Sequence, residues 1–300
     1  MVIVFGCDKR FLPHLSVAIC SLIENNSDTS LRIYVIHSDI DTVEWDKLIT
    51  LDSQKKHTFI NARVKEDDLN DLVTKGQFSK AAYYRLLIES IVTDDKVLYI
   101  DADIVVNGSV KELWNTDITD TYIAAVEEPL YTGHELGMRP DARYFNSGVM
   151  LINLEKWRND LISDKVIEFI RENGKRLIWI DQCALNAVIN GNWKRMSPKF
   201  NLQTPIFEMD LQLKERIYDF GDTDEAIKNP IIIHYTGYSK PWHLLNEHPY
   251  KNKYWQFLKK TPYSFYFPTD ITPKRLLLWC LPKSIRNAIR SYSQSKKVVA

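Results

Sequence analysis

The chain has 300 residues, of which 45% are hydrophobic and 26% are charged, a composition typical of a folded globular protein. Its 39 basic and 39 acidic residues balance, so no net field attracts nucleic acid, and we expect no nucleic-acid partner. The four cysteines form no Cys-x-x-Cys pair, which argues against a zinc ribbon or a disulfide framework and favours a reducing compartment. The sequence carries neither a signal-peptide pattern nor an apolar run long enough to cross a membrane, so we expect a cytoplasmic protein.

Strand and helix patterns alternate along most of the chain. Runs of β-branched and aromatic residues predict strands at 2–5, 31–37, 58–64, 96–106, 122–126, 148–153 and 230–235. Apolar residues at helical spacing predict helices at 12–23, 79–92 and 181–189. A further helix begins after Asp41, where Glu44 completes a reciprocal cap. This alternation predicts an α/β fold with a largely parallel sheet covered by helices on both faces.

The C-terminal segment has a different composition, because no acidic residue follows Asp270 and basic residues are interleaved with large apolar ones. The basic residues are Lys274, Arg275, Lys283, Arg286, Arg290, Lys296 and Lys297, and the apolar ones are Leu276, Leu277, Leu278, Trp279, Leu281, Ile285 and Ile289. Such a segment suits the surface of an anionic membrane, and the alternative is a helix that docks on the main domain. We therefore expect a main domain at 1–260 and a membrane-associating tail at 261–300.

Two aspartates, Asp101 and Asp103, interrupt the apolar run 96–106. Residues i and i+2 of an extended chain point to the same side, so both carboxylates are expected to face one spot. Buried carboxylates are costly unless a positive charge lies near them, and oxygen ligands favour magnesium or manganese over zinc. Open α/β sheets bind their ligands at the carboxyl ends of strands, which is where this pair is expected to lie.

Two other Asp-x-Asp sequences have structural explanations. Asp41 is the expected helix cap of the first, and Asp222 of the second follows a glycine in an expected polar turn. His234 instead ends an apolar run that enters a glycine-containing loop, where its imidazole suits a mixed oxygen and nitrogen site for manganese. A core histidine with a hydrogen-bonded ring is the alternative, and no other histidine of the chain has a comparable setting.

Five motifs follow one another along residues 1 to about 242. They are Val-Phe-Gly-Cys-Asp (4–8), Tyr-Ile-Asp-Ala-Asp (99–103), Tyr-Phe-Asn-Ser-Gly-Val-Met-Leu-Ile-Asn (144–153), Asp-Gln (181–182) and His-Tyr-Thr-Gly-Tyr-Ser-Lys-Pro-Trp (234–242). In this order they resemble the retaining glycosyltransferases of family 8, which include bacterial lipopolysaccharide galactosyl- and glucosyltransferases and glycogenin. The resemblance implies a GT-A fold with one Rossmann-like nucleotide-sugar-binding domain and a metal-dependent hexosyltransferase activity.

The resemblance also implies roles for individual residues. It assigns Mn²⁺, with Mg²⁺ as the alternative, to Asp101, Asp103 and His234, together with the diphosphate of a UDP-sugar. The donor contacts that it implies are Asp8 at the uracil edge, Phe11 stacking near it, Arg85, Asp101, Ala102, Asp103, Gly237 and Lys240, the last as a second positive contact to the diphosphate. The residues that it places around the transferred sugar are Asn146, Asp181 and Gln182.

Several of these residues also have structural explanations. Arg85 can equally be the counter-charge of the two aspartates, and Asp181 can be the N-cap of the helix that follows it. Trp242 is expected to pack in the core. Glu127 and Glu128 either line an acceptor groove or are ordinary charges at a strand end.

The resemblance implies UDP-glucose or UDP-galactose as the donor and a saccharide acceptor, and lipopolysaccharide or lipooligosaccharide core at the inner face of the cell membrane fits the basic tail. The residue beneath the sugar corresponds to Gln182, a poor nucleophile. We therefore favour same-face attack, in which the leaving phosphate takes the acceptor proton. Two alternatives are a haloacid-dehalogenase-like phosphotransferase with Asp101 as the nucleophile, and a carbohydrate-binding protein without turnover.

Overall fold

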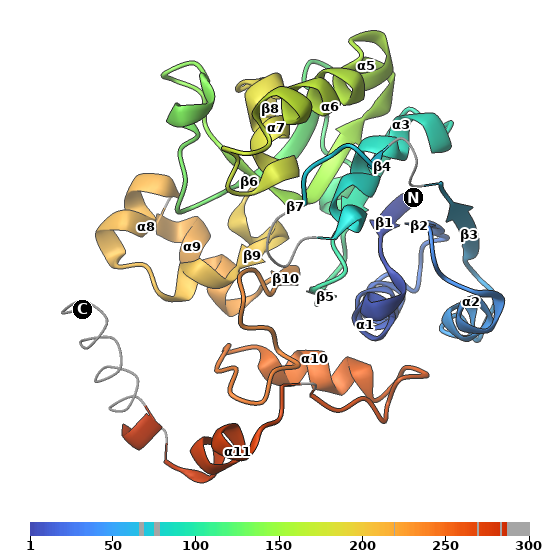
Figure 1. The fold of residues 1–300 in the computed structure, drawn as a ribbon, viewed down its shortest axis with the longest axis vertical. Coiled ribbons are helices and arrows are strands. Elements are labelled where there is room, and N and C mark those ends of the chain that lie inside the picture. The colour runs from blue at the N-terminus through green and yellow to red at the C-terminus, as the bar shows by residue number, and fades with distance from the viewer. Residues whose placement is uncertain (66–68, 75–78, 219, 269, 283, 287–300) are drawn as a thin grey trace.

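The computed structural model describes residues 1–65, 69–74, 79–218, 220–268, 270–282 and 284–286 (Figure 1). A seven-stranded sheet with the order β3-β2-β1-β4-β7-β6-β8 forms its centre. Its strands are β1 (Val2–Gly6), β2 (Arg32–His37), β3 (Thr58–Arg63), β4 (Lys96–Ile100), β6 (Ile123–Glu127), β7 (Phe145–Asn153) and β8 (Trp193–Arg195). Neighbouring strands are parallel except at β7, which is antiparallel to both β4 and β6. The predicted α/β fold with a largely parallel sheet is confirmed.

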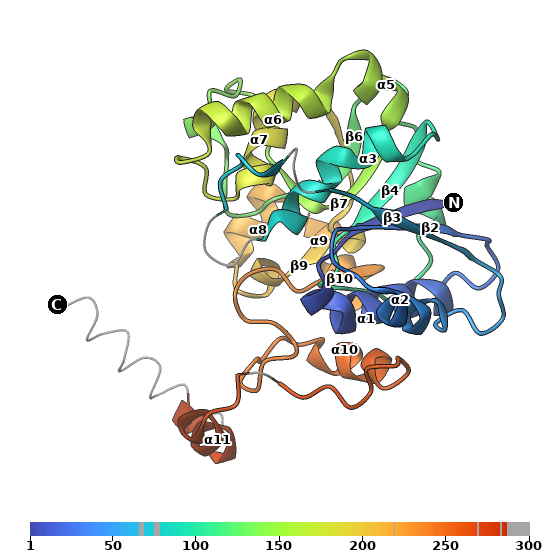
Figure 2. The ribbon, with the colours of Figure 1, turned by 45° about the vertical axis from the view of Figure 1, so that its right-hand side comes forward.

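Helices cover both faces of this sheet, as Figure 2 shows most directly. On one side lie α1 (Leu12–Glu24) and α2 (Thr42–Ile49), and on the other lie α5 (Leu154–Asn159), α6 (Ile162–Asn173) and α7 (Ile180–Ile189). Alternate residues of β1 point to opposite faces, so Ile3 and Phe5 pack in the core beneath α1, while Val2 and Val4 pack in the core beneath α6 and α7. The continuous apolar run of β1 is therefore explained by burial on both sides.

The run 96–106, predicted as one strand, is divided between two sheets. Its first half is β4, and its second half is β5 (Ile104–Val106), which joins a small sheet of the order β5-β10-β9 with β9 (Leu202–Gln203) and β10 (Ile232–His234). Asp101 and Asp103 lie at the bend between the two strands. The bend, and not the alternation of side chains along one extended strand, therefore places the two carboxylates outside the apolar interior of the sheet.

Three other local predictions are corrected. The segment 79–92 is not one α-helix but a 3₁₀ helix, η3 (Lys80–Leu87), followed by the single turn α3 (Ile88–Ile91), and four consecutive residues of η3, 83–86, are buried. Asp41 does cap α2 by accepting from the N–H of Glu44 at 3.0 Å, but the Glu44 carboxylate accepts from Lys47 at 2.8 Å, not from the N-cap. Asp222 lies in α9 (Phe220–Lys228), not in a polar turn.

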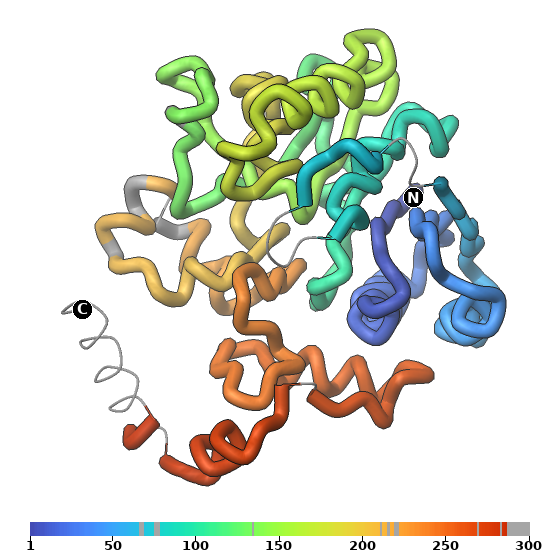
Figure 3. Tube along the Cα trace, in the orientation of Figure 1, coloured from blue at the N-terminus to red at the C-terminus, as the bar shows by residue number. Residues whose placement is uncertain are grey.

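The remaining helices connect or follow these elements. They are η1 (Lys9–Phe11), α4 (Lys111–Trp114), η4 (His134–Leu136), η5 (Pro198–Phe200), η6 (Thr204–Phe207), α8 (Leu211–Ile217), α10 (Lys251–Leu258) and α11 (Pro273–Cys280). Figure 3 follows the chain from β10 through an irregular stretch to α10, which packs against α1.

The C-terminal helix α11 lies apart from the sheet in Figure 1, and none of its residues is buried. Within the described ranges, none of the helices combines the length and apolarity needed to cross a bilayer. Lys283, Ile289, Arg290, Lys296 and Lys297 of the predicted tail lie outside the described residues.

Candidate active site

A cluster of two carboxylates and one imidazole lies where β4 and β10 end. Asp101 and Asp103 come from the bend after β4, and His234 is the last residue of β10. His234 Nε2 lies 3.3 Å from Asp103 Oδ1 and 3.9 Å from Asp101 Oδ2. The candidate ligand atoms of the three residues all lie within 4.8 Å of one another. The chain thus brings together three residues that are up to 133 positions apart, as 234 minus 101 gives.

Each aspartate divides its two oxygens between a protein cation and this cluster. Asp101 Oδ1 accepts from Arg85 Nη2 at 2.8 Å and from Tyr99 Oη at 2.7 Å. Asp103 Oδ2 accepts from Lys240 Nζ at 2.6 Å. The other oxygen of each carboxylate faces the imidazole. One oxygen of each carboxylate is therefore committed to the protein, and the second is turned toward the same space.

Lys240 provides the positive charge that pairs with Asp103. Its Nζ also donates to the carbonyl of Tyr235 at 2.7 Å, which fixes the ammonium group from a second direction. Burial alone would raise the pKa of Asp103, but Lys240 and His234 more than offset burial and hold that pKa well below its usual range. Asp103 therefore carries its negative charge throughout the physiological pH range.

A hydrogen-bond chain determines which nitrogen of His234 carries the proton. The N–H of Gly148 donates to Asn146 Oδ1 at 3.0 Å, so this atom is an acceptor. Asn201 Nδ2 donates to the same oxygen at 2.9 Å, which leaves Asn201 Oδ1 to face His234 Nδ1 at 2.9 Å. A carbonyl oxygen only accepts, so Nδ1 bears the hydrogen, and the ring is oriented with Nε2 toward the two aspartates.

The position of the imidazole requires glycine at residue 148. A Cβ added to Gly148 would lie 2.2 Å from His234 Cε1 and 2.7 Å from Asp101 Oδ2. Two carboxylate oxygens and one oriented imidazole nitrogen form a donor set that suits a hard or borderline divalent cation, and the backbone approaches closely enough to hold them there. The residues present therefore fit a divalent metal ion.

Arg85 links this cluster to a third aspartate, Asp181. The guanidinium is buried, and its Nε lies 3.1 Å from Asp181 Oδ2. Its Nη1 donates to the carbonyl oxygen of Ser147 at 2.8 Å and to the hydroxyl of the same residue at 2.7 Å. These contacts support its role as a counter-charge. Asp181 does not cap α7, because Trp179 occupies the N-cap position. Burial raises the pKa of Asp181, and Arg85 opposes that rise.

Amide side chains continue from the cluster along β7 and α7. Gln182 Oε1 accepts from the N–H of Ser147 at 3.0 Å, and Asn146 Nδ2 donates to Glu128 Oε2 at 3.1 Å. Glu128 is buried, which raises the pKa of its carboxyl group. Asn186 exchanges two hydrogen bonds with the backbone of residue 145. The result is a buried network of amide and carboxyl groups whose members bond to one another and to the backbone.

The residues predicted at the nucleoside end lie at the carboxyl end of β1. Asp8 caps η1 by accepting from the N–H two residues further on at 3.0 Å. Phe11 ends η1 and meets Trp242 edge to face, with 5.9 Å between ring centroids. Ala102 is buried between the two aspartates. Gly237 has a φ of +83° and no neighbour that a Cβ would meet, so the backbone there is accessible.

A comparison with known families identifies the chain, since the model described as glycosyl transferase family 8 matches residues 2–246. The chain belongs to glycosyltransferase family 8. This membership confirms the family, the GT-A fold and sugar transfer, all predicted from the five motifs. It also removes the phosphotransferase alternative.

Relatives and solved structures agree with this assignment. The glycosyltransferase is 31% identical to general stress protein A of Bacillus subtilis over 275 residues, which is 88% of this chain and 95% of that protein. It is 29% identical to the lipopolysaccharide 1,3-galactosyltransferase of Salmonella typhimurium over 273 residues, 87% of this chain and 79% of that enzyme. The crystal structure of galactosyltransferase LgtC in complex with donor and acceptor sugar analogs matches with a TM-score of 0.78 and 26% identity, and covers 91% of this chain and 98% of that one.

Sequence reasoning did not find every residue of the site in this glycosyltransferase. Asn201 precedes β9 in a segment without a motif, and nothing near it in the sequence indicates a contact with His234. His14 has no motif around it in the sequence, although it is buried beside Trp242. Ser147 lies inside a quoted motif but was given no role. The signal for all three lies in contacts between distant segments.

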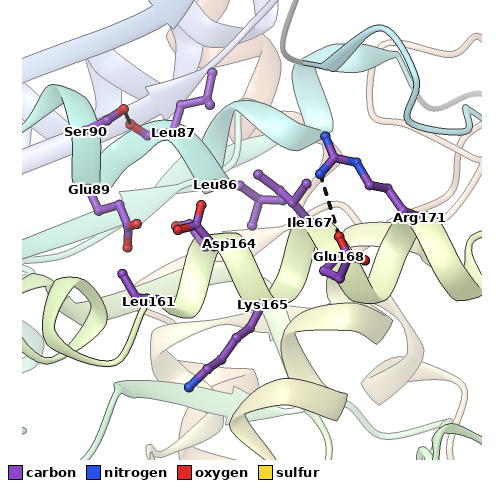
Figure 4. Close-up of a pocket in the computed structure, with 11 residues that line it drawn as sticks. Leu86, Leu87, Glu89, Ser90, Leu161, Asp164, Lys165, Ile167, Glu168 and Arg171 are labelled. Carbon is purple, nitrogen blue, oxygen red and sulfur yellow. Dashed lines mark hydrogen bonds and ion pairs between the residues drawn. The ribbon is translucent and has the colours of Figure 1, made fainter.

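A groove of about 640 Å³ opens elsewhere on the glycosyltransferase, between α3 and α6 (Figure 4). Its apolar lining residues are Leu86, Leu87, Leu161 and Ile167, and its charged ones include Glu89, Asp164 and the ion pair of Glu168 with Arg171. None of the residues predicted to bind donor, metal or sugar lines this groove. It is therefore separate from the candidate active site.

Proposed function

We propose that this glycosyltransferase moves a hexose, glucose or galactose, from a UDP-sugar to a saccharide acceptor with retention of the anomeric configuration, and that it requires Mn²⁺ or Mg²⁺. The convergence of Asp101, Asp103 and His234 at the strand ends, in a chain of family 8, is the observation that carries this proposal. The names of the galactosyltransferase relatives support the transfer of a hexose from a sugar donor to a sugar acceptor.

The metal ligands in this proposal are Asp101 Oδ2, Asp103 Oδ1 and His234 Nε2, the three atoms that face one space. When bound, a divalent cation supplies Lewis-acid stabilisation of the charge on the departing diphosphate. Lys240 adds a second positive charge at the same place, and its ammonium group is held there by the carbonyl of Tyr235. Gly237 allows the backbone to approach the phosphates.

The residues proposed to surround the hexose are Asn146, Asp181 and Gln182, and those proposed at the nucleoside are Asp8 and Phe11. Buried polar groups that bond a hydroxyl reject a sugar that lacks it, because the groups are then left unpaired.

For the chemical step we favour same-face attack, in which the leaving phosphate accepts the acceptor proton. Gln182 is a carboxamide whose oxygen already accepts from the Ser147 N–H, which supports an orienting role and not nucleophilic attack. The variant Gln182→Ala is expected to retain measurable transfer. Detection of a sugar covalently attached to any side chain by intact-protein mass spectrometry would refute same-face attack.

The acceptor that we propose is a lipid-linked glycan such as lipopolysaccharide or lipooligosaccharide core. The catalytic unit is 1–260, and the tail at 261–300 holds the enzyme on the anionic inner face of the cell membrane. Leu277 and Trp279 of α11 are 66% and 55% exposed, and Phe265 and Phe267 before it are also exposed. Large apolar side chains in a segment with basic residues and no acidic residue after Asp270 suit a membrane interface.

Co-sedimentation with lipid vesicles tests the role of the tail. The wild type is expected to sediment with vesicles that contain anionic lipid, more weakly at high salt, and not with neutral phosphatidylcholine vesicles. The double variant Leu277→Ser, Trp279→Ser is expected to remain in the supernatant. Equal sedimentation of the double variant and the wild type would contradict the proposed role of α11.

The catalytic proposal is tested by UDP release from a panel of UDP-sugars, with Mn²⁺ and with a chelator. We expect the wild type to release UDP slowly from one sugar when metal is present, and we expect Asp103→Ala to release none. The matched control is Asp222→Ala, which changes an exposed aspartate of another Asp-x-Asp sequence and should keep the wild-type rate. Donor binding without release, even with an acceptor panel, would favour the carbohydrate-binding alternative.

A further inference from the structure

A buried histidine joins α1 to the segment that carries Lys240. His14 is 4% exposed and lies in the first turn of α1. Its ring stacks on that of Trp242, with 3.5 Å between ring centroids and 13° between the planes. Its Nδ1 lies 2.7 Å from Tyr254 Oη of α10. Burial lowers the pKa of this imidazole to about 3, so it packs as a neutral ring.

The stack on Trp242 bears directly on Lys240. Only Pro241 separates the two residues, and a proline fixes its own φ, so a shift of the indole is transmitted along a short and stiff connection. The carbonyl of Pro241 accepts from Trp255 Nε1 of α10 at 3.0 Å, which fixes the connection from outside. The ammonium group at its other end lies 2.6 Å from Asp103 Oδ2.

The same ring also contacts the nucleoside end of the site. Phe11 meets His14 edge to face with 5.2 Å between centroids, and it meets Trp242 at 5.9 Å. Phe11, His14 and Trp242 therefore form a continuous aromatic cluster, and this cluster connects η1, which Asp8 caps, with the segment that carries Lys240.

We propose that His14 is a positioning residue for donor binding, which acts through its stack on Trp242 to hold Lys240 against the donor diphosphate at a fixed distance from Phe11. This inference rests on the proposed binding of a UDP-sugar beside Asp103. His14 itself contacts none of the proposed metal ligands, so its effect is indirect. An aliphatic side chain at position 14 would lose both the ring stack and the hydrogen bond to Tyr254.

The test is the affinity for UDP in the presence of Mn²⁺, measured by isothermal titration calorimetry on the full-length chain. His14→Leu is expected to weaken UDP binding by about tenfold, which corresponds to about 1.4 kcal/mol. Lys240→Ala is expected to weaken it by at least as much. Adding His14→Leu to Lys240→Ala should cause no further loss, because the histidine acts through the lysine.

Two further variants distinguish positioning from general destabilisation. His14→Phe keeps an aromatic ring against Trp242 and is expected to restore UDP affinity to within about threefold of the wild type, a difference smaller than 1.4 kcal/mol. The matched control is His57→Leu, which removes an imidazole from the region just before β3, where its Nδ1 accepts from the N–H of Leu31 at 3.2 Å. That variant should bind UDP as the wild type does.

If His14→Leu does not fold, as judged by circular dichroism, Trp242→Leu removes the same stack from the other side and is expected to give the same loss. Wild-type affinity in a folded variant that lacks the stack, or a loss that is undiminished in the Lys240→Ala background, would overturn the inference. Failure of the wild type itself to bind UDP with Mn²⁺ would instead overturn the proposed function on which the inference rests.

Discussion

Replacing Gly148 by alanine tests the metal site with a single methyl group. The added Cβ would lie 2.2 Å from His234 Cε1, 2.7 Å from Asp101 Oδ2 and 2.9 Å from His234 Nδ1. Non-bonded carbon atoms are ordinarily about 3.5–4.0 Å apart, so the imidazole must retreat by at least roughly 1.3 Å. Metal–ligand distances vary by only about 0.2 Å, so a ring displaced that far no longer reaches the cation.

The expected magnitude follows from the loss of one protein ligand. Mutation of a residue that only hydrogen-bonds to a metal ligand lowers the metal affinity by about 10–100-fold. Loss of the ligand itself should lower the affinity by at least as much. That range corresponds to about 1.4–2.8 kcal/mol of binding free energy. Overpacking beside β7 should also lower the free energy of unfolding by about 1–3 kcal/mol, which leaves a folded protein to measure.

The assay is a titration of Mn²⁺ followed by the electron paramagnetic resonance signal of the free ion. The control is Gly108→Ala, whose Cβ would lie 2.8 Å from Ile231 Cδ1, the end of a side chain that can rotate away. The control should bind Mn²⁺ with wild-type affinity. If Gly148→Ala is folded and also binds Mn²⁺ as tightly as the wild type, His234 is not held against the ion by the backbone, and the assigned geometry is wrong.

Four further results are expected. Arg85→Leu leaves Asp101 and Asp181 without their buried partner and should lower the free energy of unfolding by about 3 kcal/mol in urea titrations. Asn201→Leu removes the acceptor of His234 Nδ1 and should weaken Mn²⁺ binding by about 10–100-fold in the same resonance assay. In the unfolded chain His14 has the ordinary pKa of 6.5, whereas burial lowers its pKa in the folded protein to about 3. The contribution of the neutral, buried His14 to the free energy of unfolding is therefore complete above pH 6.5 and is lost as the pH falls toward 3. Urea midpoints should therefore decline less steeply with acid in His14→Phe. A chelator should abolish UDP release while circular dichroism stays unchanged, because protein cations already pair with the aspartates.

Patterns within short segments were sufficient to predict the sheet and part of the site. The strands β1, β2 and β3 and the helix α1 begin and end within one or two residues of the predicted ranges, because apolar periodicity is a local property. Asp101 and His234 both end apolar runs, and strand ends of an open sheet gather ligands, so their proximity could be predicted.

The bend at Asp101 and Asp103 could not be predicted in the same way. Apolar residues on both sides of the pair are compatible with one continuous strand, as 96–106 was interpreted. What divides the run is the partner of its second half, since β5 pairs with β10 more than a hundred residues away. Asn201 and His14 were missed for the same reason, because the contacts that define their roles come from distant segments.

The charges of the cluster were also interpreted too simply at the level of the sequence. Two neighbouring carboxylates suggested that a metal ion must lie between them, yet Arg85 and Lys240 already pair with one oxygen of each. Charge balance alone therefore does not demand a cation. The orientation of His234 does provide an argument, because Asn201 holds its protonated Nδ1 and turns Nε2 toward two carboxylate oxygens. Nε2 and one oxygen of each aspartate therefore face the same space, which is the arrangement that a divalent cation bound by all three residues would need.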